Sequence, residues 1–141
     1  MKFNNLIPEL NVSDVKKSVV FYTKILSFRI EYERPEDKFV FLSFQGSQIM
    51  ICQQANDKWN TGRLEFPFGR GINFQIEVDD IEPIVESLRK NKHPLFMEPK
   101  DNWYRQGRFL LGNREFLVQD PDGYLLRFAQ DLGKKPIKSQ H

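Results

Sequence analysis

Two oppositely charged side chains stand on the strands that open and close the predicted fold. Glu9 lies on the first predicted strand and Arg127 on the last, and both belong to alternating apolar and polar runs. Because alternate residues of a strand share a face, they are expected on one polar face, with Asn73 and Gln75 supplying hydrogen bonds to a desolvated charge pair. Met50 adds an apolar contact, so we predict an amphipathic small-molecule site on this face. A structural salt bridge on a solvated sheet face is the alternative.

Aromatic residues accompany charged ones in two long stretches without periodicity, 56–71 and 99–113. Loops of this length in a compact domain are often functional. Trp59, Trp103 and Tyr104 are therefore predicted to stack on a planar ligand, since ring stacking contributes roughly 0.5–1.5 kcal/mol beyond burial. The alternative is that these rings only pin the loops to the body of the protein.

Residues suited to catalysis or metal binding are sparse. The two histidines, His93 and His141, fall after a predicted helix and at the last position, and Cys52 lies on a predicted strand, where a packing role is favoured. We find no nucleophile–base pair and no cofactor fingerprint, and we predict no catalytic residue, metal or cofactor. The enzymatic alternative uses Glu9 as a general base, with Arg127 anchoring a carboxylate or stabilising an enolate.

Composition limits the class of protein. The chain has 141 residues, a formal charge of +2 and 13% aromatic residues, including 13 Phe. This length suits one domain, and the small, scattered charge does not favour nucleic acid. No signal peptide and no apolar run near 18 residues is present, so we expect a soluble, cytoplasmic protein without a membrane partner.

An internal repeat organises the chain. Shifting the sequence by 66 positions places Val12 on Val78 and Asp14 on Asp80, and a looser repeat relates 39–51 to 116–128. Each copy reads as strand, helix and three strands, which predicts an α+β fold of two βαβββ modules. We place the modules at about 5–55 and 71–132 of a single domain, with a linker at 56–70 and a polar tail at 133–141.

Apolar periodicity assigns the two faces of the predicted sheets. Residues on one face of each helix are apolar, and we expect them to cover one face of the strands. The covered strand residues are Leu10, Val12, Ile49, Ile51, Phe74, Ile76, Val78, Leu126 and Phe128. The residues between them face the opposite way and include the predicted site.

The two ends of the repeat resemble a known family. Val12-Ser-Asp14, with Phe21-Tyr22 and Leu26-Ser-Phe28, and the closing Arg114-Glu-Phe116 through Asp120-Pro-Asp-Gly123 to Phe128, are similar to the vicinal oxygen chelate superfamily of glyoxalases, bleomycin resistance proteins and dioxygenases. The resemblance covers roughly residues 5 to 132. It implies two modules curled into a partly open barrel around a cleft, commonly in a homodimer.

The resemblance also implies where a metal would be held. Metal enzymes of the superfamily carry His, Glu or Gln at positions that correspond here to Ile7, Met50, Asn73 and Arg127. Divalent metals need imidazole or carboxylate donors, and an arginine cation would repel them. We therefore expect similarity to the metal-free members, which sequester drugs.

Drug sequestration would place rings on a flat ligand and carboxylates near its cation. By resemblance, Glu9, Glu77 and Glu115 are candidates to face such a cation, beside the aromatic residues above. Two departures disfavour bleomycin itself: the pI is about 8.7, and Leu111-Gly-Asn precedes Arg114 where a stacking Trp is expected. A lyase, isomerase or dioxygenase-like enzyme and a regulatory dimer with a vestigial cleft are the other interpretations.

Overall fold

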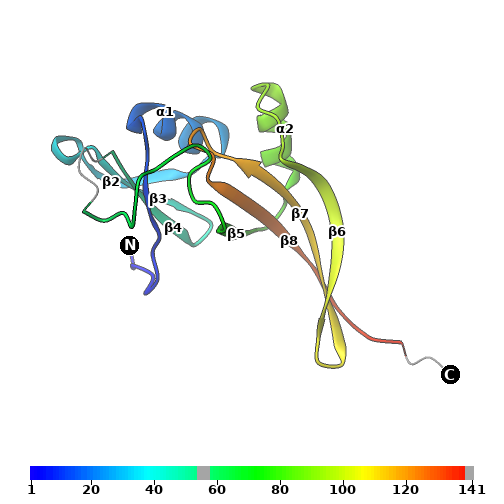
Figure 1. Cartoon of the computed structure of the whole chain (residues 1–141). Coiled ribbons are helices and arrows are strands. Elements are labelled where there is room, and N and C mark those ends of the chain that lie inside the picture. Colours follow the sequence, from blue (N-terminus) through cyan, green and yellow to red (C-terminus); the bar gives the residue numbers. More distant parts are fainter. Residues whose placement is uncertain (54–57, 139–141) are drawn as a thin grey trace. The chain divides into compact units, whose positions relative to one another are not determined.

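The computed structural model describes residues 1–53 and 58–138. Its elements follow the order that the repeat predicts (Figure 1). The first set is β1 (Glu9–Asn11), α1 (Val15–Val20), β2 (Arg29–Arg34), β3 (Phe39–Phe44) and β4 (Ser47–Cys52). The second set is β5 (Asn73–Val78), α2 (Glu82–Lys90), β6 (Met97–Gln106), β7 (Phe109–Gln119) and β8 (Leu125–Pro136). A π-helical turn, Phe21–Ile25, continues α1, and a 3₁₀ turn, Pro35–Asp37, follows β2.

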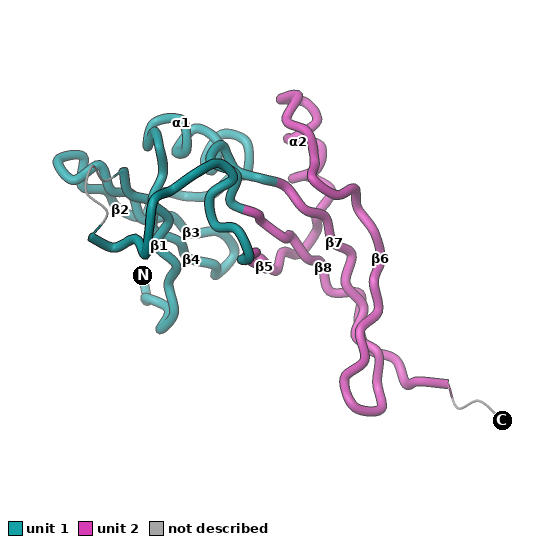
Figure 2. The backbone as a smooth tube through the Cα atoms, viewed as in Figure 1, with its two compact units in different colours: residues 1–72, 119–124 teal, residues 73–118, 125–141 magenta. Residues whose placement is uncertain are grey.

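The chain divides into two compact units (Figure 2). Unit 1 contains Met1–Ile72 together with Gln119–Tyr124, and unit 2 contains Asn73–Val118 together with Leu125–His141. The unit boundary at residue 72 lies close to the predicted start of the second module. The turn between β7 and β8 is the exception, because it belongs to unit 1.

Sheet topology confirms the duplication. Unit 1 has strand order β1-β4-β3-β2 and unit 2 has β5-β8-β7-β6, so each first strand pairs with the last strand of its own module. Both of these pairs are parallel, with Glu9 opposite Met50 and Gln75 opposite Arg127. The described strands thus form two four-stranded sheets that are not closed into one barrel.

Both helices begin at duplicated hydrogen bonds. The Asp14 carboxylate accepts from the backbone N–H groups of Lys16 and Lys17 and caps α1. In addition, the Gln53 side chain accepts from the Val15 N–H at 2.9 Å, and Gln130 accepts from the Ile81 N–H at 3.1 Å. In each module, therefore, a glutamine within or just after the last strand accepts a hydrogen bond from a backbone N–H group at the start of the helix.

Apolar side chains fill the predicted face of each sheet. Leu10, Ile49 and Ile51 are buried in unit 1, as are Ile76 and Phe128 in unit 2. The helices contribute further fully buried residues, among them Tyr22, Leu26, Ile81 and Leu88. The sequence assignment of the covered face is confirmed.

A turn from the second half of the sequence completes unit 1. Asp120 accepts hydrogen bonds from the Tyr22 hydroxyl at 2.8 Å and from the N–H groups of Asp122 and Tyr124. Asp122 accepts from the backbone N–H and hydroxyl of Ser13. Burial raises the pKa of Asp120 to about 6, although these hydrogen bonds oppose the shift. Burial, followed by the charge of Asp120, holds the pKa of Tyr22 well above its usual value.

Two sequence assignments need correction. The stretch 99–113, predicted to be an irregular loop, lies mostly in the β6–β7 hairpin. Polar residues occupy both faces of this hairpin and hide the strand alternation. The predicted tail at 133–141 begins inside β8, which extends to Pro136. Residues 58–72 lack helices and strands, and positions 56 and 57 of the predicted linker, 56–70, lie outside the described residues.

Candidate functional site

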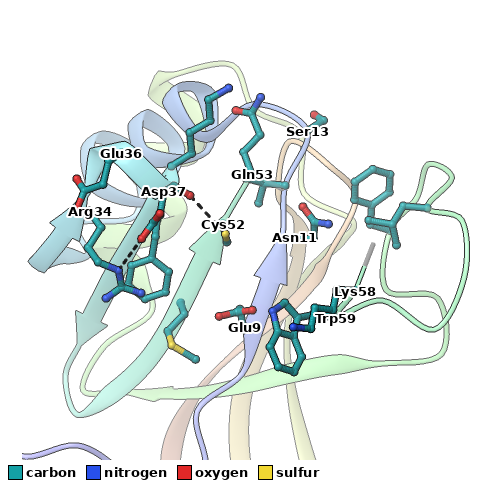
Figure 3. A pocket seen from close by; sticks show the side chains of 16 residues that line it. Glu9, Asn11, Ser13, Arg34, Glu36, Asp37, Cys52, Gln53, Lys58 and Trp59 are labelled. Carbon is teal, nitrogen blue, oxygen red and sulfur yellow. Dashed lines mark hydrogen bonds and ion pairs between the residues drawn. The ribbon is translucent and has the colours of Figure 1, made fainter. Parts of the chain in front are cut away.

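Unit 1 contains a pocket of about 1160 Å³ over the uncovered face of its sheet. Side chains from β1, β3 and β4 form its floor, and residues 58–68 form one side (Figure 3). We call this uncovered surface the open face of unit 1. The pocket volume lies slightly above the range of roughly 300–1,000 Å³ that is typical of small-ligand sites.

Strand register arranges the open face in two transverse rows. The first row crosses the four strands as Glu9, Met50, Phe41 and Tyr32. The second row crosses them as Asn11, Cys52, Phe39 and Arg34. Each row therefore has a polar group at β1, a sulfur-containing side chain at β4 and an aromatic ring at β3.

Aromatic rings form a continuous wall on β2 and β3. Tyr32 stacks on Phe41 with 5.2 Å between ring centroids, and Phe3 meets Phe41 edge to face at 5.3 Å. Phe39 and Phe41 are buried, whereas Tyr32 and Phe3 are exposed. Stacked and edge-to-face rings fix one another in orientation, and of these rings only Phe39 is among the residues that line the pocket.

The charged groups around the pocket differ in whether they have a partner. Arg34 binds Asp37 at 3.2 Å and lies over the Phe39 ring at 3.9 Å. The ammonium of Lys58 lies 5.4 Å from the centre of the Trp59 ring. Among the described residues, Glu9 has no ion-pair partner, so its carboxylate on the pocket floor is available to a cation.

The strand aromatics were absent from the predicted site. Phe39 lines the pocket but is missing from the predicted site, whose aromatic residues all come from the long stretches between the predicted elements. The alternation Phe39-Val40-Phe41-Leu42 carried the signal, since it places both phenylalanines on the face opposite Val40. Cys52 packs against Phe39 and Phe41, in line with the packing role assigned from the sequence.

An N-terminal segment covers part of the same face. Gln48 accepts from the Asn4 N–H and donates to the Lys2 carbonyl, both at 2.7 Å. Asn4 also donates to the Gly46 carbonyl at 2.9 Å. These bonds hold Phe3 against the aromatic wall.

A separate polar cluster lies on the uncovered face of unit 2. Glu115 is 2% exposed and its Oε1 accepts hydrogen bonds from Asn102, at 2.8 Å, and from the Tyr104 hydroxyl. The hydrogen bond to Glu115, followed by burial, raises the pKa of Tyr104, whereas the positive charge of Arg127 opposes the rise. The cluster therefore brings together three predicted site residues, Tyr104, Glu115 and Arg127.

Trp103 points away from this cluster. Its ring lies against Gly112, where an added Cβ would come within 2.6 Å of the ring. The Lys135 ammonium lies 3.8 Å from the centre of the same ring. Trp103 and Tyr104 are adjacent in sequence, so strand alternation directs them to opposite faces, and they cannot stack together on one ligand from the same face.

The predicted site residues are divided between the units. Glu9, Met50 and Trp59 line the pocket of unit 1. The predicted residues in unit 2 are Asn73, Gln75, Trp103, Tyr104, Glu115 and Arg127. The charge pair between Glu9 and Arg127 stays a prediction, because each unit is described by itself. Glu77 lies on β5 opposite Ala129.

The donor set at the four metal-ligand positions does not suit a divalent metal. Those positions hold an alkyl group at Ile7, a thioether at Met50, an amide at Asn73 and a guanidinium at Arg127. Within residues 1–53 and 58–138, no group of three or more His, Cys, Asp or Glu side chains is arranged to hold an ion. We derive no chemistry through a metal at these positions.

Comparison with known proteins identifies the family. The sequence profile of the Glyoxalase/Bleomycin resistance protein/Dioxygenase superfamily matches residues 5–128. The chain belongs to this superfamily. A bleomycin resistance protein from Geobacillus stearothermophilus is 28% identical, with 89% of this chain and 96% of the relative covered. A lactoylglutathione lyase from Haemophilus influenzae is 26% identical, with 89% of this chain and 91% of the relative covered.

Solved structures of low sequence identity share the superfamily fold. TioX from Micromonospora sp. ML1 has a TM-score of 0.69 at 17% identity and covers 92% of this chain and 100% of its own. A virulence protein from Salmonella typhimurium has a TM-score of 0.66 at 19% identity, with 92% and 98% covered. In the described part of the chain, no helix is long and apolar enough to cross a bilayer.

Proposed function

We propose that the protein binds an amphipathic organic molecule, with a planar and positively charged part, in the pocket of unit 1. The set of Glu9, Met50, Phe39 and Trp59, which all line the pocket, is the observation that carries this proposal. It joins a carboxylate, a thioether and the Phe39 ring on the sheet face to the Trp59 ring beside them. Such a set matches a flat ligand that bears a cation at one edge.

Each part of this set has a physical role in binding. The ligand plane would contact Phe39 and Trp59, and Met50 would adapt to its outline because the thioether side chain is flexible and polarisable. Glu9 would face the cation. Arg34 and Asp37 already neutralise each other, so they would shape the rim of the pocket without fixing the sign of the ligand charge.

Sequestration of a drug is the finer form of the proposal. The relatives named bleomycin resistance proteins support it, and binding alone would provide protection without a catalytic group. The pI of about 8.7 does not favour long-range attraction of a cationic drug, so we propose recognition at short range. A homodimer in the cytoplasm is part of this proposal, and the mass in solution tests the dimer.

A lyase or isomerase of the same superfamily is the second candidate. The lactoylglutathione lyase relatives favour it. In this chain the reaction would use Glu9 as a general base, or a metal site of another composition. Turnover of a carbonyl or enolisable substrate that is lost in Glu9→Gln would support this candidate.

A thermal-shift screen tests the proposal. The panel contains a bleomycin, 9-aminoacridine as a planar cation, small carboxylates and divalent metals, each with and without chelator. A ligand at a hundredfold excess over its Kd stabilises the native state by about 2.7 kcal/mol. We expect a shift with planar cations that chelator does not change. Shifts confined to metals or to small carboxylates would contradict the proposal and favour the enzyme.

A further inference from the structure

Two buried polar atoms in unit 2 have no hydrogen-bond partner within the described residues. They are Oε2 of Glu115 and Nε of Arg127. Buried polar atoms are nearly always hydrogen-bonded, and an unpaired one costs about 1–3 kcal/mol. An unpaired acceptor and an unpaired donor on the same surface therefore point to a missing partner.

Strand alternation places both groups on one face. Phe116 stacks on Phe128 with 5.3 Å between ring centroids, so these two residues share the covered face of unit 2. Glu115 and Arg127 each precede one of the stacked rings, and β7 and β8 are neighbours in the sheet. The side chains of Glu115 and Arg127 therefore project from the opposite, uncovered face, on two adjacent strands.

The surrounding hydrogen bonds hold Glu115 in place. Asn102 and Tyr104 both donate to its Oε1, which leaves Oε2 as the free acceptor. The Arg127 side chain has no hydrogen bond or ion pair in the described part of the chain, and Gln75 lies beside Arg127 in strand register. Tyr104 is 43% exposed, so this member of the cluster is in contact with solvent.

The charges restrict the chemistry of the partner. A simple anion would gain from Arg127 but would face the carboxylate of Glu115, and a simple cation would face the reverse conflict. A neutral planar group with a donor and an acceptor complements both atoms without a charge conflict. We propose that unit 2 binds a carboxamide or ureide group, whose N–H donates to Glu115 Oε2 and whose carbonyl accepts from Arg127 Nε.

Fragment titration followed by NMR tests this site without knowledge of the full ligand. The probes are acetamide and methylurea, with acetate and methylammonium as charged controls of similar size. The Arg127 Nε–H signal is assigned by its loss in Arg127→Lys. Small ligands can bind with high efficiency per atom, so saturable shifts at millimolar concentration are expected for acetamide and methylurea alone.

Two variants separate the proposed contact from a general effect. Glu115→Gln should weaken acetamide binding at least tenfold, whereas Arg105→Gln, an exposed change on β6, should leave it unchanged. A larger response to acetate would assign an anion site in place of the proposed one. No response to any fragment would assign the two atoms to bound water and overturn the proposal. The test is independent of the pocket in unit 1, because it reads an Arg127 atom directly.

Discussion

At the scale of single residues, burial outweighs hydrogen bonding at Asp120. Three donors favour the ionised carboxylate, yet its pKa is raised to about 6 from an ordinary value of 3.8 because desolvation is the larger effect. A carboxyl group with a raised folded pKa binds its proton more strongly in the native state. Its contribution to the free energy of unfolding is therefore greatest below pH 3.8 and declines as pH rises toward 6.

Asp120→Asn should remove this pH dependence. The difference in unfolding free energy between the wild type and the variant should shift against the wild type by about 3 kcal/mol between pH 3.8 and pH 7, since each pKa unit corresponds to about 1.4 kcal/mol. Urea denaturation at several pH values measures it. Glu33→Gln, an exposed change in the same unit, is the control. If the difference in unfolding free energy does not vary with pH, burial does not raise the pKa of Asp120.

Some residues of the site could be predicted and others could not. Glu9 and Met50 were placed on one face because alternation is unambiguous in a half-covered strand, and the structure pairs them. Tyr32 could not be assigned to that face from alternation, since the β2–β3 register shifts between Ile30 and Tyr32. The aromatic wall depends on this local irregularity.

At the scale of elements, the loose repeat that relates 39–51 to 116–128 aligns residues that lie on different faces of their sheets. The sequence repeat aligns Phe39 with Phe116, but Phe39 lies on the open face of unit 1 and Phe116 on the covered face of unit 2. The turn between β3 and β4 contains only Gln45 and Gly46, whereas residues 120–124 separate β7 from β8. The longer turn gives the β7–β8 pair a different register from the β3–β4 pair. The periodicity within a single strand does not reveal such a difference in turn length.

The N-terminal segment gives an element-scale prediction. Gln48→Ala removes both hydrogen bonds to Lys2 and Asn4, each worth about 1 kcal/mol, and should release Phe3 from Tyr32 and Phe41. Hydrogen exchange in residues 1–7 should then become faster, with little change in β3. Ser47→Ala on the same strand is the control. Equal protection in Gln48→Ala and the control would show that ring packing alone holds the segment.

At the scale of the whole molecule, unit 1 is built from two distant parts of the sequence. Residues 119–124 belong to it, and their Asp120 and Asp122 bind Tyr22 and Ser13. The Asp-Pro-Asp-Gly turn thus completes the packing of the first module. This explains physically why the turn was so informative in the sequence, although the sequence alone assigned it to the second module.

A fragment that contains only residues 1–72 should therefore be incomplete. It would leave the Tyr22 hydroxyl and the Ser13 groups without their buried partners and would expose the rings that contact the turn, among them Phe68. We expect no cooperative thermal transition for this fragment by circular dichroism, with the full chain as the comparison. A fragment that melts cooperatively near the temperature of the full chain would show that the turn is dispensable.

The central claim is that the pocket of unit 1 selects a planar cation through Glu9. Calorimetric titration with three acridines of one ring system tests it most directly: 9-aminoacridine is a cation near neutral pH, acridine is mostly neutral and acridine-9-carboxylate is an anion. We predict that the cation binds most tightly to the wild type, and that Glu9→Gln removes this preference while acridine affinity is kept. Tighter binding of the anion, or an unchanged preference in Glu9→Gln, would contradict the claim.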